Sequence, residues 1–347
     1  MDFYREMERV RRVKEITRYE LEWLLELGEE HTAYLYRLAR EVCDEVYGKK
    51  IFLRGLIEYT NYCKNNCYYC GIRAGNVGLS RYRMSDDRIL ECVEKGYRLG
   101  ARTFVLQGGE SPMDSDRDLV ALITRIHEAY PDCAITMSIG EKSRASYEAY
   151  YQAGAERYLL RHETANREHY HHLHPNSMKQ EHRIQCLFDL KSIGYQVGCG
   201  MMIGSPGQTV DCLYDDLMLI RELNPQMIGI GPFVADRDTP FSGERSGTAE
   251  QTLKMLAIIR LIHPQVLLPA TTALATIDPR GYEKGILAGA NVLMPDLTPP
   301  DIRKKYSIYD RKNGFHADDE NEAETILQRI RSIGYEIAVD RGDSLVV

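Results

Sequence analysis

Between residues 51 and 294, short apolar segments alternate with amphipathic segments eight times, and this alternation constrains the fold more than any other feature. Alternating strands and helices predict a parallel sheet covered by helices. Eight such units over this length are typical of a (β/α)8 TIM-type barrel, which usually takes about 250 residues. A doubly wound open sheet is the alternative that the alternation leaves open. The predicted strands cover 51–58, 102–107, 133–138, 156–161, 195–203, 227–233, 266–272 and 290–294.

The segments between the strands carry residues that are typical of helix boundaries. Side chains that can cap a first helical turn stand near several predicted starts, at Ser85, Asp114, Thr209 and Thr248. Glycines that can end a helix stand at Gly100, Gly154, Gly194 and Gly289. The predicted helices cover 85–99, 114–129, 143–153, 178–193, 209–223, 248–262 and 279–287.

Two further segments flank this repeat. Apolar residues at helical spacing predict helices within residues 3–47. At the other end, a polar stretch at 310–322 precedes a predicted helix at 322–333 and an apolar segment at 335–339. The predicted parts are an N-terminal helical extension at 1–50, the barrel at 51–300 and a short C-terminal tail at 301–347.

Three cysteines follow the first predicted strand with the spacing C-x3-C-x2-C, at Cys63, Cys67 and Cys70. Three thiolates can hold three irons of a cubane and leave the fourth iron open, whereas structural clusters usually take four cysteines. An open iron can bind and activate a small molecule, so the spacing indicates catalysis. Structural zinc would need a fourth ligand at an ordered spacing. The other six cysteines are scattered singly in apolar contexts and are interpreted as buried thiols.

The bulk composition excludes several classes of protein. The odd count of nine cysteines and the absence of an apolar leader disfavour a secreted, disulfide-bonded protein. The net charge of −7, without a long basic run, disfavours a nucleic-acid partner. There is no run of 18 uncharged apolar residues, so we predict no membrane span. We therefore expect a cytoplasmic location, where thiols stay reduced.

Polar and glycine residues gather at the predicted carboxyl ends of the strands, where barrel enzymes keep their sites. They include Gln107–Glu110, Arg161–Thr164 and Thr271–Thr272. Glycines let the backbone approach a ligand, a carboxylate can hold an amine or ribose hydroxyls, and a guanidinium can hold a carboxylate. Structural alternatives stay open, namely tight turns at the glycines, an ion pair between Arg161 and Glu163, and helix capping by the threonines.

Four histidines lie close together at His169, His171, His172 and His174. His171 and His174 have the i, i+3 spacing of a helical metal-binding pair. Ligating histidines usually have an acidic partner, and we expect none to serve these four. We therefore favour solvated surface histidines over a metal site.

Taken together, these motifs resemble the radical S-adenosylmethionine (SAM) superfamily and, within it, the HydE-type maturases of FeFe-hydrogenase. The resemblance spans about residues 20–309. Biotin synthases and methylornithine synthases share the general layout. The runs that carry the resemblance to the HydE-type maturases are Asn61–Arg73, Arg81–Met84, Tyr158–Asn166, Gly204–Thr209, Gly229–Phe233 and Pro269–Ala273.

The resemblance implies a role for each of three residue sets. Cys63, Cys67 and Cys70 would bind a 4Fe–4S cluster and so carry the catalysis. The residues implied in SAM binding are Tyr69, Gly108, Gly109, Glu110, Ser138, Glu163 and Arg183. The residues implied in lining the substrate cavity are Thr136, Arg161, Thr271, Thr272, Met294 and Tyr306.

The resemblance also implies a reaction and its partners. A reduced cluster would cleave SAM to a 5′-deoxyadenosyl radical that acts on a cysteine-derived sulfur substrate, with an iron–cysteine complex carrying CO and cyanide as the leading candidate. An electron donor and the other hydrogenase maturases, HydG and HydF, would be partners. One cluster per chain is predicted, because no cysteine follows Cys212. The alternatives are a radical SAM mutase or synthase acting on a small amino acid, and a non-catalytic cluster scaffold.

Overall fold

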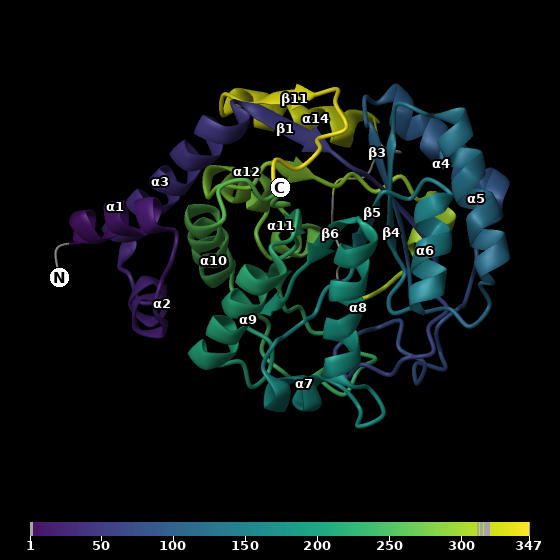
Figure 1. The fold of residues 1–347 in the computed structure, drawn as a ribbon, viewed down its shortest axis with the longest axis horizontal. Helices are drawn as coiled ribbons and strands as arrows, with labels where there is room; N and C mark the ends of the chain where they lie inside the picture. Colours follow the sequence, from purple (N-terminus) through teal and green to yellow (C-terminus); the bar gives the residue numbers. More distant parts are fainter. Residues whose placement is uncertain (1–2, 311, 313–314, 316–319, 347) are drawn as a thin grey trace.

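Parallel strands form the centre of the protein and helices cover them (Figure 1). The structure is a computed structural model that describes residues 3–310, 312, 315 and 320–346. All pairings between its regular strands are parallel. The strands are β1 (Lys50–Leu53), β2 (Gly55–Thr60), β3 (Thr103–Gly108), β4 (Ala134–Ser138), β5 (Arg157–Leu159), β6 (Gln196–Cys199), β7 (Met202–Ile203), β8 (Met227–Ile228), β9 (Gly231–Pro232), β10 (Val292–Leu293) and β11 (Glu336–Ala338).

The seven predicted helices between the strands are confirmed to within two residues at their ends. Ser85, Thr209 and Thr248 cap their helices through side-chain oxygens that accept from backbone amides. The prediction for Asp114 is wrong, because Ser115 is the cap. Asp114 instead accepts hydrogen bonds from Tyr59 and Arg83. These helices are α4 (Asp86–Arg98), α5 (Asp116–Ala129), α6 (Arg144–Gln152), α8 (Gln180–Ile193), α9 (Val210–Leu223), α10 (Ala249–Ile262) and α12 (Gly281–Leu287).

The regular strands fall into three sheets and do not close into a ring. The largest sheet has the order β2-β3-β4-β5-β6-β8, the second β10-β1-β11 and the third β7-β9. Single parallel bridges join Met227 to Leu267 and Pro269 to Val292. Backbone hydrogen bonds accompany both bridges, from Ile228 N to Leu267 O and from Ala270 N to Val292 O, each at 3.0 Å. The observed architecture is therefore an α/β fold with a parallel sheet and covering helices.

The seventh predicted strand, at 266–272, is wrong as a regular strand. Pro269 has no amide hydrogen to donate to a neighbouring strand. Thr271 already caps the short helix α11 (Thr272–Ile277), since its hydroxyl accepts from Leu274 N. The predicted strand at 195–203 is divided into β6 and β7 at Gly200, where a Cβ would lie 2.0 Å from Gly229 O.

The N-terminal extension forms three helices that lie against α10, and the second of them also lies against α9 and the third against α12 (Figure 1). Buried cations join them to the rest of the protein. Lys254 of α10 donates to the carbonyls of Leu25 and Leu27, each at 2.9 Å. Such contacts satisfy carbonyls that a helix end leaves without partners. The three helices are α1 (Phe3–Val13), α2 (Arg18–Leu25) and α3 (Glu29–Tyr47).

The C-terminal tail begins beside the cysteine loop, where Gly71 N donates to Ile308 O at 3.0 Å, and its last residues lie at the amino ends of the strands. Its helix α14 (Glu320–Ser332) leads into β11, which pairs with β1 (Figure 1). Beyond β11, Asp343 accepts from the buried guanidinium of Arg157 at 2.7 Å, and Thr103 donates to Arg341 O at 2.7 Å. The predicted polar stretch at 310–322 lies mostly outside the described residues. Two short helices complete the fold, α7 (Arg167–Leu173) and α13 (Pro300–Arg303).

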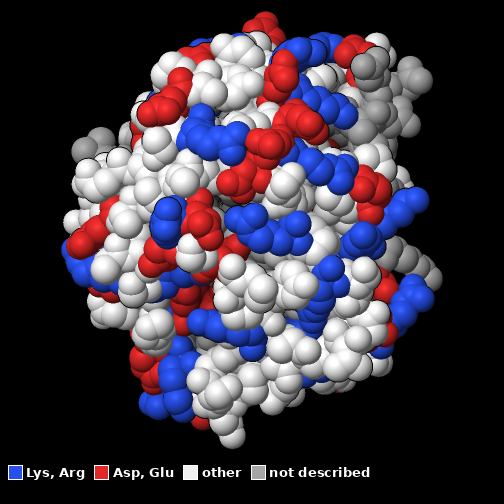
Figure 2. Space-filling model, turned by 90° about the vertical axis from the view of Figure 1, so that its right-hand side faces the viewer, with Lys and Arg blue, Asp and Glu red and all other residues white. Residues whose placement is uncertain are grey.

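The surface that carries α4 and α5 mixes both signs of charge. Figure 2 shows basic and acidic side chains interspersed over this face. Several form ion pairs, such as Arg125 with Asp87 and Arg98 with Glu94. Among the described residues, no helix combines the length and the apolar character needed to cross a bilayer.

Candidate active site

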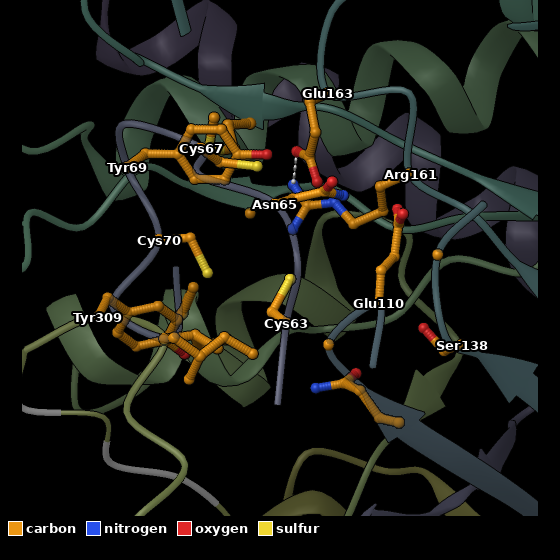
Figure 3. Close-up of a pocket in the computed structure, with 18 of the residues that line it drawn as sticks. Cys63, Asn65, Cys67, Tyr69, Cys70, Glu110, Ser138, Arg161, Glu163 and Tyr309 are labelled. Carbon is orange, nitrogen blue, oxygen red and sulfur yellow. Dashed lines mark ion pairs between the residues drawn. The ribbon is translucent and has the colours of Figure 1, made fainter. Parts of the chain in front are cut away.

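A cavity of about 260 Å³ opens at the carboxyl ends of the strands. Its lining comes from the cysteine loop after β2 and from the residues that end or follow β3, β4, β5 and β9. This cavity is lined by two acidic side chains, Glu110 and Glu163, and by two positively charged ones, Arg161 and Arg183. Figure 3 shows the three cysteines on one side of the space and Glu110, Arg161 and Glu163 on the other. The cavity is thus charged on one side and thiol-lined on the other.

All three thiols of the C-x3-C-x2-C motif line the cavity. All nine cysteines are free, so none forms a disulfide. Burial raises the pKa of Cys63 and Cys70 and raises that of Cys67 to about 12. Binding of a metal would therefore have to displace their protons.

The spacing of these thiols does not suit a single ion. Zinc–sulfur bonds of about 2.3 Å hold two ligating sulfurs within about 4.6 Å of each other. Among the described residues, one group of three or more potential ligands has all its ligand atoms within 4.8 Å, and it contains none of these cysteines. A larger, multi-iron group fits this arrangement better than a zinc ion does.

Glycines allow Glu110 to reach the cysteine loop. Gly140 has φ of +74°, and a Cβ there would lie 2.0 Å from Glu110 Cγ. A Cβ at Gly109 would lie 2.4 Å from Tyr62 O and 2.6 Å from Cys63 Cβ. Any larger residue at either position would displace Glu110 or the loop. The glycines therefore do more than form tight turns.

Arg183 of α8 connects several charged groups at the edge of the cavity. Its Nη1 lies 2.8 Å from Glu141 Oε1 and 3.5 Å from Glu110 Oε1. Its Nε donates to Arg161 O at 2.6 Å. The side chain is only 12% exposed, so these partners fix its position. Glu141 lies three residues after the predicted site residue Ser138, but no role was predicted for it.

Arg161 and Glu163 form the ion pair that the sequence left open as a structural alternative. Arg161 Nη2 lies 3.3 Å from Glu163 Oε2 and donates to Met201 O at 2.7 Å (Figure 3). Glu163 has φ of +68°, a conformation that is uncommon for residues other than glycine. Both side chains still face the cavity, so the pair is available to a ligand.

The residues around this pair in the motif Arg161–Asn166 hold the loop in place. His162 is buried, and its Nε2 lies 3.2 Å from Asp216 Oδ1. Asp216 also accepts from Ala165 N at 2.5 Å. Asn166 caps α7 by accepting from His169 N at 3.0 Å. These residues therefore position Arg161 and Glu163 rather than line the cavity.

The histidine cluster is not a set of solvated surface residues, and that prediction is wrong for two of the four. His169 and His174 are buried. His169 Nδ1 lies 3.0 Å from Thr164 Oγ1, and its Nε2 lies 3.1 Å from Pro206 O. Among the described residues, none of the four histidines belongs to a group of three or more potential metal ligands whose atoms lie within 4.8 Å of one another.

The structure brings most of the predicted site residues to this one cavity. Three of them do not line it. Thr136 lines a smaller cavity nearer the amino ends of the strands, Thr272 begins α11, and Met294 packs beside a buried apolar cluster. The predicted residues that line the main cavity are Cys63, Cys67, Tyr69, Cys70, Gly108, Gly109, Glu110, Ser138, Arg161, Glu163, Arg183, Thr271 and Tyr306.

The sequence also left several lining residues without a role. Asn65 and Ile72 belong to the cysteine loop, and Tyr309 lies three residues after the predicted Tyr306. Their closeness in sequence to predicted residues is the signal that could have indicated them. Phe233 ends the run Gly229–Phe233 that carries the resemblance, whereas Met178 had no such signal, because only the fold brings it to the cavity.

Comparison with known proteins decides the family. The radical SAM superfamily model matches residues 57–220. The chain is 41% identical over 311 residues to the FeFe-hydrogenase maturase subunit HydE of Thermotoga maritima, covering 89% of this chain and 88% of that protein. The chain belongs to the HydE family of radical SAM enzymes. It is therefore an enzyme, and its family implies a 4Fe–4S cluster and SAM.

Other members of the superfamily share the fold of this HydE-family chain. A 3-methylornithine synthase of Methanosarcina acetivorans is 27% identical over 315 residues, covering 90% of this chain and 87% of that protein. The crystal structure of methylornithine synthase PylB superposes with a TM-score of 0.84 at 26% identity, covering 96% of this chain and 97% of that one. The structure of HydG, a maturase of the FeFe-hydrogenase, has a TM-score of 0.79 at 22% identity, covering 97% of this chain and 76% of that one, and shows the common fold alone.

Proposed function

We propose that this enzyme binds one 4Fe–4S cluster through Cys63, Cys67 and Cys70, and SAM beside it. The proposal is supported by three thiols that share one loop and line a charged cavity. The other six cysteines do not line this cavity, so no fourth thiolate is at hand. When bound and reduced, the cluster supplies the electron that cleaves SAM to methionine and a 5′-deoxyadenosyl radical.

The charged groups of the cavity suit the two ends of SAM. Its methionine part carries an amine and a carboxylate, which suit the Glu110 carboxylate and the Arg183 guanidinium. Gly108 and Gly109 line the same cavity, and they let the end of β3 approach Thr60 and Tyr62 closely. We assign Tyr69, beside the third cysteine, to the adenine. Ser138 and Glu163 line the same space and complete the proposed SAM site.

The substrate is proposed to lie deeper in the cavity, next to Arg161, Thr271 and Tyr306. Support comes from the lining, since these residues face the same space as the cysteines. The resemblance predicts the same role for Thr136, Thr272 and Met294. Their contact with a bound substrate stays a prediction. The protein's own contribution is to bind, orient and shield the reacting groups from water.

We propose that the substrate is cysteine-derived and contains sulfur, with the iron–cysteine complex carrying CO and cyanide as the leading candidate. The reaction would belong to the assembly of the FeFe-hydrogenase active site. The 41% identity to a HydE maturase subunit supports this assignment. An electron donor and the maturases HydG and HydF would then be partners.

We further propose that residues 51–300 form a closed (β/α)8 barrel flanked by the segments 1–50 and 301–347. The bridges from Met227 to Leu267 and from Pro269 to Val292 support closure, because they connect the largest sheet to β10 and thus to β1. A closed barrel would place every strand's carboxyl end around the one cavity.

Anaerobic reconstitution followed by product analysis tests the proposed function. The wild-type protein should hold about four irons per chain, change its EPR spectrum when SAM is added, and release 5′-deoxyadenosine. Cys67→Ala should abolish all three signals. The matched control is Cys92→Ala, which removes a buried thiol from α4 outside the cavity. Loss of the cluster in both variants, or in neither, would contradict the assignment.

A second candidate function is a rearrangement or synthase reaction on a small amino acid. The likeness to 3-methylornithine synthase, which covers 90% of this chain, favours it. Cleavage of SAM that is stimulated by small amino acids, and not by the iron–cysteine complex, would select this alternative.

A further inference from the structure

A second group of potential metal ligands lies outside the active-site cavity, where α8 meets the loop after β4. It consists of Glu141, His182 and Cys186, whose ligand atoms all lie within 4.8 Å of one another. His182 Nδ1 lies 2.6 Å from Glu141 Oε2 and 3.9 Å from Cys186 Sγ. Among the described residues this is the one group of three or more such side chains that meets this distance.

The fold positions each ligand of this group. His182 and Cys186 are four residues apart on α8, so both lie on the same face of the helix. Cys186 is buried and its Sγ lies 3.9 Å from Lys142 O, next to Glu141 in the loop. Helix α8 therefore holds two of the ligands rigidly, and the loop supplies the third.

Burial raises the pKa of the Cys186 thiol, so a metal would have to displace its proton, and a hydrogen bond from Tyr147 reaches the same sulfur. The buried Tyr147 hydroxyl accepts from Lys142 N at 2.9 Å and is also hydrogen-bonded to Cys186. Because the hydroxyl oxygen already accepts from that amide, its own proton is available to the sulfur. Outer hydrogen bonds of this kind orient metal ligands and tune them.

The donor set selects the class of metal. One thiolate, one imidazole and one carboxylate are the ligand types that zinc takes in proteins. Calcium and magnesium, in contrast, prefer oxygen ligands throughout. The side chain of His182 is 63% exposed, so solvent can reach the site and supply a fourth ligand.

The charges around the group are compatible with a divalent cation. The carboxylate of Glu141 and a thiolate at Cys186 would together neutralise the two positive charges of such a cation. The positive Arg183 lies nearby, yet its Nη1 contacts the other oxygen of Glu141, Oε1 at 2.8 Å, and lies 3.5 Å from Glu110. A metal bound to Oε2 and to His182 Nδ1 would replace the proton that these two atoms share at 2.6 Å, while Oε1 keeps Arg183 in place.

We propose that Glu141, His182 and Cys186 bind one zinc-type divalent cation, with water as the fourth ligand. This site is separate from the cluster site proposed at the three cysteines of the cavity, and the two sites have no ligand in common. Through Glu141 it is joined to Arg183, which lines the cavity. The metal would fasten the loop after β4 to α8 and so hold Arg183 at the edge of the active site.

Zinc binding by the full-length, cluster-loaded protein tests the proposal. With the cavity cysteines occupied, an anaerobic titration of zinc against a chromophoric chelator should reveal one tight site per chain. X-ray absorption at the zinc edge should show one sulfur at about 2.3 Å and nitrogen or oxygen at about 2.0–2.2 Å. His182→Ala and Cys186→Ser should each weaken zinc binding roughly tenfold or more.

Controls separate this site from other ways to bind zinc. His171→Ala removes a histidine on a neighbouring helix that is not in the group, and it should leave zinc affinity unchanged. A chain with Cys63, Cys67 and Cys70 all changed to Ala should keep the tight zinc site, so this arm succeeds or fails independently of the proposed cluster. His182→Ala changes an exposed side chain, so it should leave the thermal unfolding temperature of the metal-free protein unchanged. This variant therefore tests the site even if Cys186→Ser disturbs folding.

Three results would overturn the proposal. The first is zinc affinity that is the same in the wild type and in His182→Ala. The second is a zinc environment without sulfur. The third is loss of tight binding when only the cavity cysteines are replaced.

Discussion

The hydroxyl of Tyr69 lies 3.1 Å from Nε2 of His174, a buried histidine that is far from it in sequence. His174 Nδ1 lies 3.0 Å from the carbonyl of Tyr170, which can only accept, so Nδ1 carries the proton. Nε2 is then an acceptor, and the Tyr69 hydroxyl donates to it. His174 also stacks on the Tyr170 ring, with centroids 4.0 Å apart. The histidine thus fixes the orientation of the tyrosine next to the third cysteine.

Replacing His174 with Ala should weaken SAM binding while the cluster is retained. The variant loses one hydrogen bond that orients Tyr69, and such bonds contribute about 0.5–1.5 kcal/mol. We expect the dissociation constant of SAM to rise about three- to tenfold, measured by the SAM-dependent EPR change. His171→Ala, in the short helix α7 that ends just before His174, is the control. An unchanged SAM affinity in His174→Ala would show that Tyr69 does not need this partner.

Acidification should destabilise the protein, partly through His174. Burial lowers the pKa of His174 to about 3 and that of His263 to about 4, whereas an unfolded histidine titrates near 6.5. The unfolded state therefore binds more protons below about pH 6.5, and stability falls as the pH drops from there toward the folded pKa values. Urea unfolding at pH 7 and pH 5 should show a loss of at most about 2 kcal/mol per histidine. In His174→Gln the loss of unfolding free energy between pH 7 and pH 5 should be smaller by the contribution of this one histidine. An equal loss in the variant and the wild type would contradict the prediction.

Gly140→Ala should impair the site more than it impairs the fold. An alanine at φ of +74° is strained by about 1–2 kcal/mol, and its Cβ would collide with Glu110. We expect a small fall in stability together with a clear loss of SAM-dependent 5′-deoxyadenosine. Gly78→Ala, where the nearest atom would be 3.7 Å away, should change neither quantity. Full activity of Gly140→Ala would mean that Glu110 can move without consequence.

Asp343→Ala should destabilise the protein from its C-terminal tail. Arg157 is buried and loses its carboxylate partner at 2.7 Å, and a buried donor without a partner costs about 1–3 kcal/mol. Chemical denaturation measures this loss. Arg157→Met removes the buried charge itself, so Asp343→Ala leaves no unpaired cation in that background. The double variant Arg157→Met/Asp343→Ala should therefore be more stable than the sum of the two single changes predicts. Asp87→Ala breaks an exposed pair and should cost less than about 1 kcal/mol.

Much of this fold could be predicted, because helix boundaries have local causes. Ser85 and Thr248 cap through their own side chains, and Gly100 and Gly154 end helices with φ of +92° and +112°. The strand at 266–272 failed because apolar character alone cannot show whether a neighbour will pair regularly. Asp114 failed because a neighbouring serine competes for the same cap.

The site was predictable where function depends on a short motif. The cysteine loop and Gly108–Glu110 are contiguous in sequence, so their closeness in space follows directly. His174 and Glu141 were missed because each acts through a partner that only the folded chain brings near, namely Tyr69 and Arg183. Their side chains give no local signal of those partners.

The pairing of β1 has a consequence for how the protein is made. Its neighbours, β10 and β11, contain Val292 and Ile337, so β1 is synthesised long before the strands with which it pairs. Contacts between such distant segments form slowly and leave strand edges exposed meanwhile. β1 therefore lacks both neighbours until the segments that form β10 and β11 have been made, and a truncated product without those two segments carries an unpaired strand that invites aggregation.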